Sequence, residues 1–168
     1  MVAITAITQI STERICLNPS EGICVDGILA ANYVPGTAVV LIAGVWTTAD
    51  NDTGSHKLMK WGVVGYKKRV NQSTGALIDI ETAWDTSETG EMRVPIWTDG
   101  FCIVKMTDPA APLPGGTGLM VSATAGELIT TDGAQMDYGT AAQIGVSGDV
   151  FIVAAIGKFM GRMWGGHN

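Results

Sequence analysis

The sequence predicts an all-β protein whose strands form a small antiparallel barrel or sandwich. Short apolar runs recur along the chain, and turn residues separate them every 8 to 15 residues, which is typical of such folds. The run ALIDIETAW (76–84) alternates apolar and polar residues, as a strand with one buried face does. No window carries a sustained helical stripe with caps, so only short helical turns are expected, near 138–146.

The predicted strands follow one another through the middle and end of the chain. They cover residues 36–46, 60–66, 76–84, 101–106, 126–131 and 149–157. The first follows Pro35-Gly36, the fifth precedes Asp132-Gly133, and the last follows Ser147-Gly148. These dipeptides favour tight turns and hairpins, so neighbouring strands are expected to run antiparallel.

A length of 168 residues predicts one domain with a substantial core. We divide the chain into residues 1–18, an extended N-terminal arm or a first strand, and residues 19–168, a single β-rich domain. Ile4, Ile7 and Ile10 are apolar positions among Thr, Ser and Gln. An arm that orders only against a partner explains this pattern as well as an ordinary first strand of the barrel does.

The composition points to protein partners. Only 15% of the residues are charged while 46% are hydrophobic, which hints at apolar surface that a partner or other copies cover. The net charge of −6 argues against a polyanion-binding protein, so no nucleic-acid partner is expected. Five of the ten basic residues lie within 57–69, and we interpret them as a solvated strand-and-turn face.

No membrane partner is expected either. The N-terminal sequence lacks the basic and apolar regions of a signal peptide. The longest apolar run, VFIVAAIG (150–157), is far too short to cross a bilayer as a helix.

The cysteines argue against both a disulfide framework and a zinc site. Cys16, Cys24 and Cys102 are odd in number, which argues against a disulfide framework, and they lack the C-x-x-C spacing typical of zinc sites. Apolar residues flank each of them. Buried free thiols, in a protein that folds in a reducing cytoplasm, are the expected state.

The glycine-rich stretch LPGGTGLMVSATAGEL (113–128) resembles a phosphate-binding loop only superficially. Leu119 follows the last clustered glycine, where a P-loop has Lys and a hydroxyl residue. The following residues favour a strand, whereas a P-loop opens a helix. We therefore predict a tight turn at Pro114-Gly115-Gly116 that leads into a strand.

No constellation of residues predicts catalysis, a metal ion or a cofactor. His56 and His167 are the two histidines, and neither lies in a nucleophile motif. Asp50 and Asp52 begin like a calcium loop, but Trp61 occupies the twelfth position, where such a loop has glutamate. The chain is therefore predicted not to be an enzyme.

Five tryptophans allow two interpretations. Trp46, Trp61, Trp84, Trp97 and Trp164 suit a core or a subunit interface. Exposed tryptophans instead stack flat ligands, so a ligand-binding β-module for a carbohydrate or similar molecule is the alternative function.

Several phrases resemble a known family. GTAVVLIAGVWTTA, KWGVVGY, VPIWTDGFCIVKM, LPGGTGLMVSATAGELIT and AAQIGVSGDVFIVAAIGKF are similar in layout to capsid decoration (cement) proteins of tailed bacteriophages and related viruses, over residues 35 to about 157. The resemblance implies a β-barrel or β-tulip-like domain, as a homotrimer. The length and the 85–100 segment depart from the smallest members, so no contact residues are transferred from them.

The resemblance further implies a structural virion protein, made in the host cytoplasm, that binds the major capsid protein on the capsid exterior and stabilises the head. In some relatives an N-terminal arm adds a strand to the capsid, a sound route to binding. Ile4, Ile7 and Ile10 are the predicted capsid-binding residues.

Overall fold

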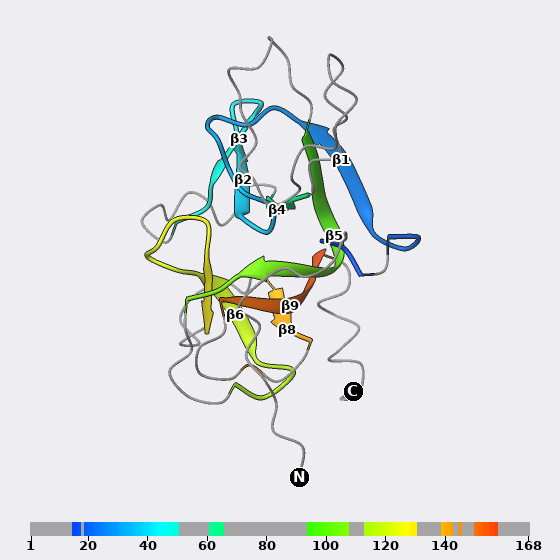
Figure 1. Cartoon of the computed structure of the whole chain (residues 1–168), viewed down its shortest axis with the longest axis vertical. Helices are drawn as coiled ribbons and strands as arrows, with labels where there is room; N and C mark the ends of the chain where they lie inside the picture. Colours follow the sequence, from blue (N-terminus) through cyan, green and yellow to red (C-terminus); the bar gives the residue numbers. More distant parts are fainter. Residues whose placement is uncertain are drawn as a thin grey trace, which may run out of the picture.

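A computed structural model describes the chain as an all-β protein whose antiparallel sheet curls into a half-barrel (Figure 1). The residues it describes are 15–17, 19–50, 61–65, 94–107, 113–130, 139–142, 145 and 150–157. The predicted fold class is thereby confirmed for these residues. Of the predicted arm or first strand, 1–18, residues 1–14 and 18 lie outside them, as does the predicted strand at 76–84.

Nine strands form the sheet. They are β1 (Ile23–Gly27), β2 (Ala38–Ile42), β3 (Val45–Thr48), β4 (Trp61–Val64), β5 (Val94–Lys105), β6 (Gly118–Val121), β7 (Leu128–Thr130), β8 (Gly139–Ala141) and β9 (Phe151–Ile156). Their order across the sheet is β3-β2-β4-β5-β9-β8-β6-β7, with β1 paired to β5.

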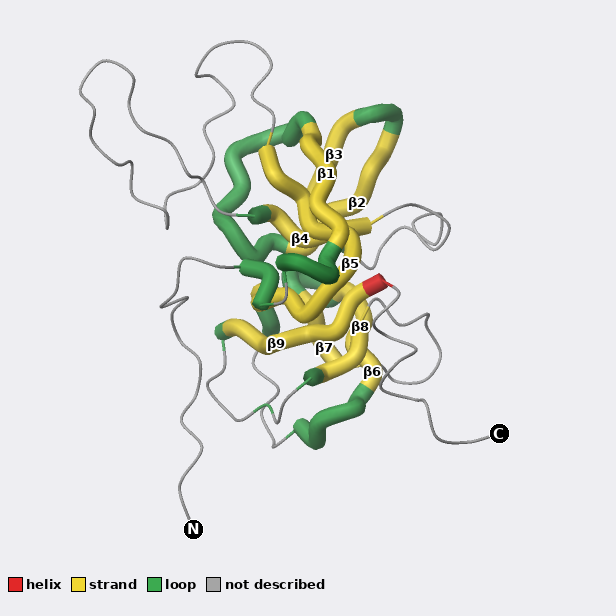
Figure 2. Tube along the Cα trace, turned by 90° about the vertical axis from the view of Figure 1, so that its right-hand side faces the viewer, coloured by secondary structure: helices red, strands yellow, loops and turns green. Residues whose placement is uncertain are grey.

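The long strand β5 joins the two halves of the sheet. Its first half pairs with β1 and β4, and its second half, from Gly100 to Lys105, pairs with β9. Figures 1 and 2 show β1 to β4 grouped on one side of β5, with β6, β8 and β9 on the other. The change of partner occurs at Gly100, whose φ of 131° favours glycine.

Short segments cover both ends of the strand order. Beside β3, Ile28 accepts a hydrogen bond from the Trp46 amide, and the Ala30 amide donates one to Trp46, both at 2.8 Å. Beside β7, the Thr107 amide donates to Leu128 at 2.9 Å. These contacts satisfy backbone groups that an open sheet edge would leave exposed.

Strands β2 and β4 are buried on both faces, which explains their continuous apolar sequences. In β2, Val39 packs into a cluster around Trp46, while Val40 packs into a larger cluster on the opposite face. In β4, Val64 packs into the cluster around Trp46 and Val63 packs into the larger cluster. The larger cluster extends across to β6, β7 and β9 through Leu119, Leu128, Ile152 and Ile156.

A tight turn divides the predicted strand 36–46 into the hairpin β2-β3. Ala43 and Gly44 both have positive φ, 50° and 86°, as the two central residues of a type I′ turn do. The chain lacks the usual Asn-Gly signal here, so apolar Ile42, Ala43 and Val45 hid the turn from sequence analysis. Short helical turns near 138–146 were also predicted wrongly in part, because β8 occupies Gly139–Ala141.

The glycine-rich stretch forms the predicted turn and strand. The Thr117 amide and hydroxyl both donate to the Pro114 carbonyl, at 3.3 and 2.8 Å. Gly116 takes a φ of 88°, and β6 follows. The stretch therefore feeds a core strand, since Leu119 and Val121 are buried.

Candidate interaction surfaces

The predicted capsid-binding residues Ile4, Ile7 and Ile10 lie outside the described residues. The described chain begins beside β5 with residues 15–17, which the sequence analysis assigned to the arm or first strand. Ile15 and Cys16 are buried, whereas Leu17 is 46% exposed. The residues that follow the predicted contact positions are thus anchored in the sheet.

Two exposed apolar residues, Leu17 and Ile23, are placed along β5 within a few residues of each other in its register. The Leu17 amide donates to the Phe101 carbonyl at 2.8 Å, and Ile23 stands opposite Asp99. Leu17 and Ile23 are 46% and 42% exposed. We call this pair the Leu17–Ile23 patch. Apolar groups held in solvent by ordered strands are suited to burial against another protein.

Strand β1 continues this patch as a sheet edge. It pairs with β5 on one side, and no strand in the described part of the chain pairs with its other side. Ile23, Cys24 and Asp26 are exposed along it. A free edge of this kind accepts an extended segment through backbone hydrogen bonds.

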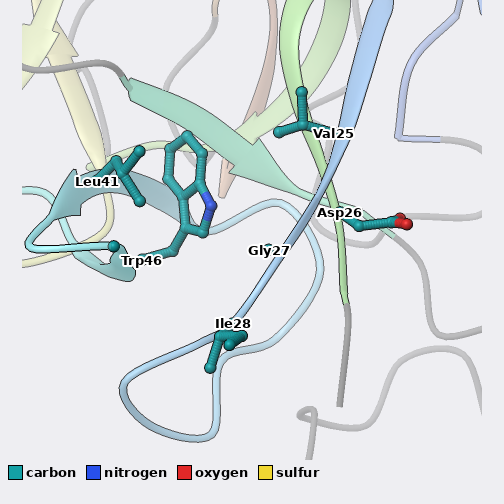
Figure 3. Close-up of a pocket in the computed structure, with 7 residues that line it drawn as sticks. Val25, Asp26, Gly27, Ile28, Leu41 and Trp46 are labelled. Carbon is teal, nitrogen blue, oxygen red and sulfur yellow. The ribbon is translucent and has the colours of Figure 1, made fainter. Parts of the chain in front are cut away.

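A hollow of about 420 Å³ opens beside the other end of β1 (Figure 3). Its apolar lining comes from β1, from Leu41 of β2 and from Trp46 of β3. The indole lies between Leu41 and the strand that carries Gly27, and the Asp26 carboxylate points away from it. A Cβ at Gly27 would overlap the indole ring, so only glycine lets the ring pack against the strand.

The described tryptophans do not form an exposed stacking platform. Trp46 is only 3% exposed, and Trp61 and Trp97 are partly buried against the larger cluster. Trp84 and Trp164 lie outside the described residues. Core packing, the commoner of the two interpretations, therefore holds for the three that are described.

A small polar network closes the junction between β5 and the β6-β7 hairpin. The Thr107 hydroxyl lies 2.8 Å from the Ser122 hydroxyl and donates to the Glu127 carboxylate at 3.0 Å. The Ser122 hydroxyl also accepts the Thr124 amide at 3.1 Å. Ser122 is 3% exposed, so these bonds satisfy a buried hydroxyl, and the network is structural.

The three cysteines differ in environment. Cys16 and Cys102 are buried thiols that are not in a disulfide, as predicted, but Cys24 is exposed, because it lies on the edge strand β1. A hydrogen bond with Cys16, and then burial, raise the pKa of the Cys102 thiol. Desolvation raises the pKa of Cys24, and the nearby Asp26 carboxylate raises it further.

Within the described ranges, no group of three or more His, Cys, Asp or Glu residues is placed to hold a metal ion. His56 and His167, the two histidines considered for catalysis, lie outside these ranges. A search of the same ranges finds no helix with the length and apolar character needed to cross a membrane.

Comparison with solved structures finds the same fold in a phage capsid. The chain is similar to a chain in the structure described as the capsid of Myoviridae phage XM1. The TM-score is 0.61 with 16% sequence identity, and the match covers 94% of this chain and 96% of that one. No protein-family model matches the sequence, and no curated protein matches it.

The match covers nearly the full length of both chains, so the two share their overall fold. At this level of identity the similarity establishes the fold alone. The surfaces that a partner could use are the Leu17–Ile23 patch with the free edge of β1, and the hollow over Trp46.

Proposed function

We propose that this protein is a structural component of a phage virion that binds the outer surface of the capsid and stabilises the head. The observation that carries the proposal is the shared fold with a chain of a phage capsid over 94% of the sequence. The layout of the sequence, which resembles capsid decoration proteins, supports the same role independently of the coordinates.

The surface of the described residues suits such a role. The Leu17–Ile23 patch combines apolar area with the edge of β1 that no described strand pairs, and both are suited to burial against a neighbouring subunit. Weak contacts of this kind, repeated over a lattice, add up to strong binding. The proposed partners are the major capsid protein and further copies of this chain in a homotrimer.

We further propose that residues 1–18 act as the capsid-binding arm, with Ile4, Ile7 and Ile10 in contact with the capsid. Residues 15–17 pair with β5, so they give such an arm a fixed origin on the sheet. Residues 19–168 form the β-rich domain that the arm tethers.

The direct test is the composition of virions of the phage that encodes the protein. Quantitative mass spectrometry of purified particles is expected to find the chain in a fixed ratio to the major capsid protein. Protease added to intact particles should cleave it, because it lies outside the shell. Absence from virions, or protection from protease equal to that of the packaged contents, contradicts the proposal.

The arm is tested by deleting residues 2–12. The deletion ends before Ile15, so the bonds that join residues 15–17 to β5 stay intact. We expect a folded protein that no longer binds heads. Replacing Ile4, Ile7 and Ile10 by serine should have the same effect, whereas replacing Thr5, Thr8 and Ser11 by alanine should preserve binding. An unfolded deletion product would show that the arm is a core strand.

The homotrimer is tested by light scattering on the purified protein and on protein released from virions. A mass of three chains is expected in both samples. A monomer in both would leave the capsid role but remove the trimer from it.

A further inference from the structure

Two buried cysteines face each other across adjacent strand segments. Cys16 and Cys102 form an antiparallel bridge. On either side of it, the Leu17 amide donates to Phe101 and the Ile103 amide donates to Ile15, both at 2.8 Å. This pattern makes Cys16 and Cys102 a non-hydrogen-bonded pair, the closer of the two kinds in an antiparallel ladder.

That position suits a disulfide. Cα atoms of such pairs lie about 4.5 Å apart, and disulfides join Cα atoms roughly 4.4 to 6.8 Å apart. The two thiols already share a hydrogen bond. Gly22 packs closely against Cys16 and Trp97, since a Cβ on Gly22 would lie 2.9 Å from the Cys16 sulfur and 3.0 Å from the Trp97 ring. The tight packing limits the sulfur to few positions.

The pair is protected from oxidants while the sheet is closed. Cys16 is 2% exposed and Cys102 is fully buried, and the raised pKa of Cys102 leaves little reactive thiolate. Residues 15–17 are nevertheless a short segment, and two of the backbone bonds that join it to β5 are those described above. Local opening of such a short segment exposes Ile15 and Cys16, but it costs less free energy than unfolding the whole sheet. Opening would bring Cys16 into solvent and leave Cys102 on the central strand.

We propose that Cys16 and Cys102 form a cross-strand disulfide when the protein meets a small-molecule disulfide such as oxidised glutathione, and that this bond fastens residues 15–17 to β5. In the first step the Cys16 thiolate attacks one glutathione sulfur. The glutathione S–S bond breaks and one glutathione thiolate leaves.

In the second step, while the segment is still open, the Cys102 thiolate attacks the Cys16 sulfur of the mixed disulfide, and the segment closes only afterwards. The second glutathione thiolate leaves. Two electrons pass from the protein to glutathione, and the departing thiolates take up the two protons that the cysteines lose. Cys24 stays outside this pair because it stands opposite Trp97 in β1 and β5.

The bond would fix the position of residues 15–17 on the sheet. It would also close a loop from Cys16 to Cys102, and closing a loop of that length constrains the unfolded chain strongly. We therefore expect oxidation to raise Tm by about 10 °C. The inference does not depend on the proposed capsid role, because it rests only on the pairing of the two segments.

The test treats the purified full-length protein with oxidised glutathione and maps its peptides. Trypsin together with a protease that cleaves after glutamate separates Cys16 from Cys24 at Glu21, so the linked cysteines can be assigned in the unmodified sequence. We expect a peptide pair joined through Cys16 and Cys102, with two hydrogen atoms lost, and a raised Tm that returns to its starting value on reduction.

Variants supply the matched controls. Cys24→Ser should keep the linkage and the rise in Tm, while Cys16→Ser should lose both. If Cys16→Ser fails to fold, the peptide map of the unmodified protein still decides the question. Two free thiols at Cys16 and Cys102 after oxidation, a bond from either to Cys24, or a linkage that leaves Tm unchanged would each overturn the proposal.

Discussion

Replacing Gly62 by alanine should weaken the junction between β4 and β5. Gly62 lies in β4 opposite Val39 of β2. A Cβ built on it would lie 2.6 Å from Cγ2 of Ile96 and 2.8 Å from the carbonyl oxygen of Trp97. Ordinary contacts begin at 3.4 Å. The carbonyl belongs to the backbone of the central strand, so no side-chain rotation relieves the overlap.

The size of the effect follows from these distances. To reach 3.4 Å from 2.8 Å, β4 must move about 0.6 Å away from β5, which strains the pairing of Val63 with Trp97. Overpacking of this kind costs about 1–3 kcal/mol. Alanine recovers roughly 0.5–1 kcal/mol through the smaller entropy of its unfolded chain. Taking the centres of the two ranges, the net loss is about 1 kcal/mol, equivalent to a Tm lower by roughly 2–4 °C.

The assay is urea unfolding followed by tryptophan fluorescence and circular dichroism. We expect a lower midpoint urea concentration with an unchanged m-value, because the substitution hardly changes the surface area that unfolding exposes. Gly116→Asn is the control, since nothing lies within 4 Å of its Cβ position and asparagine tolerates positive φ. A Gly62→Ala protein as stable as the parent would refute the packing described for this junction.

Three further changes test other parts of the molecule. Leu128→Ala removes a fully buried side chain of β7 and should lower the free energy of unfolding by about 2–5 kcal/mol in urea titrations; a loss below 1 kcal/mol would contradict its core position. Thr107→Val keeps the shape of the side chain but removes its bonds to the Ser122 hydroxyl and the Glu127 carboxylate. The free energy of unfolding should fall by about 1–2 kcal/mol. An unchanged free energy of unfolding would mean that the network does not stabilise the hairpin. Asp26→Asn removes a negative charge that helps to raise the pKa of Cys24. More Cys24 thiolate is then present at pH 8, so iodoacetamide should alkylate Cys24 faster. An unchanged alkylation rate would show that the Asp26 charge does not act on Cys24.

The sequence carried enough information for the fold class because apolar runs map directly onto buried strands. The runs in β2, β4 and β9 are continuous because nearly all of their residues are buried or half-buried on both faces. The predicted strand 101–106 is only the second half of β5. Pro95 and Gly100 interrupt the pattern before it, but neither ends the strand, since β1 and β4 hold that half on both sides.

Strand β1 escaped prediction for a related reason. Its sequence, ICVDG, is short and combines a cysteine, an acid and a glycine. It becomes a strand because β5 supplies a partner, and tertiary pairing of that kind overrides weak local preference. The same pairing leaves Ile23 and Cys24 exposed, whereas their apolar neighbourhood favoured burial.

The candidate surfaces were less predictable than the fold. The predicted capsid contact of Ile4, Ile7 and Ile10 rests on their apolar spacing. It stays a prediction because these residues lie outside the described ones. The Leu17–Ile23 patch depends on how residues 15–17 and β1 align along β5. An aliphatic residue next to a strand has the same sequence signature whether its side chain faces the core or the solvent.

Co-sedimentation with undecorated, expanded phage heads tests the capsid role most directly. The purified protein is titrated against a constant amount of heads from the phage that encodes it, and the pelleted protein is measured. We predict saturable binding at a fixed ratio to the capsid subunits, lost when residues 2–12 are deleted. Folded protein that stays in the supernatant with intact heads would contradict the capsid role and return attention to the hollow over Trp46.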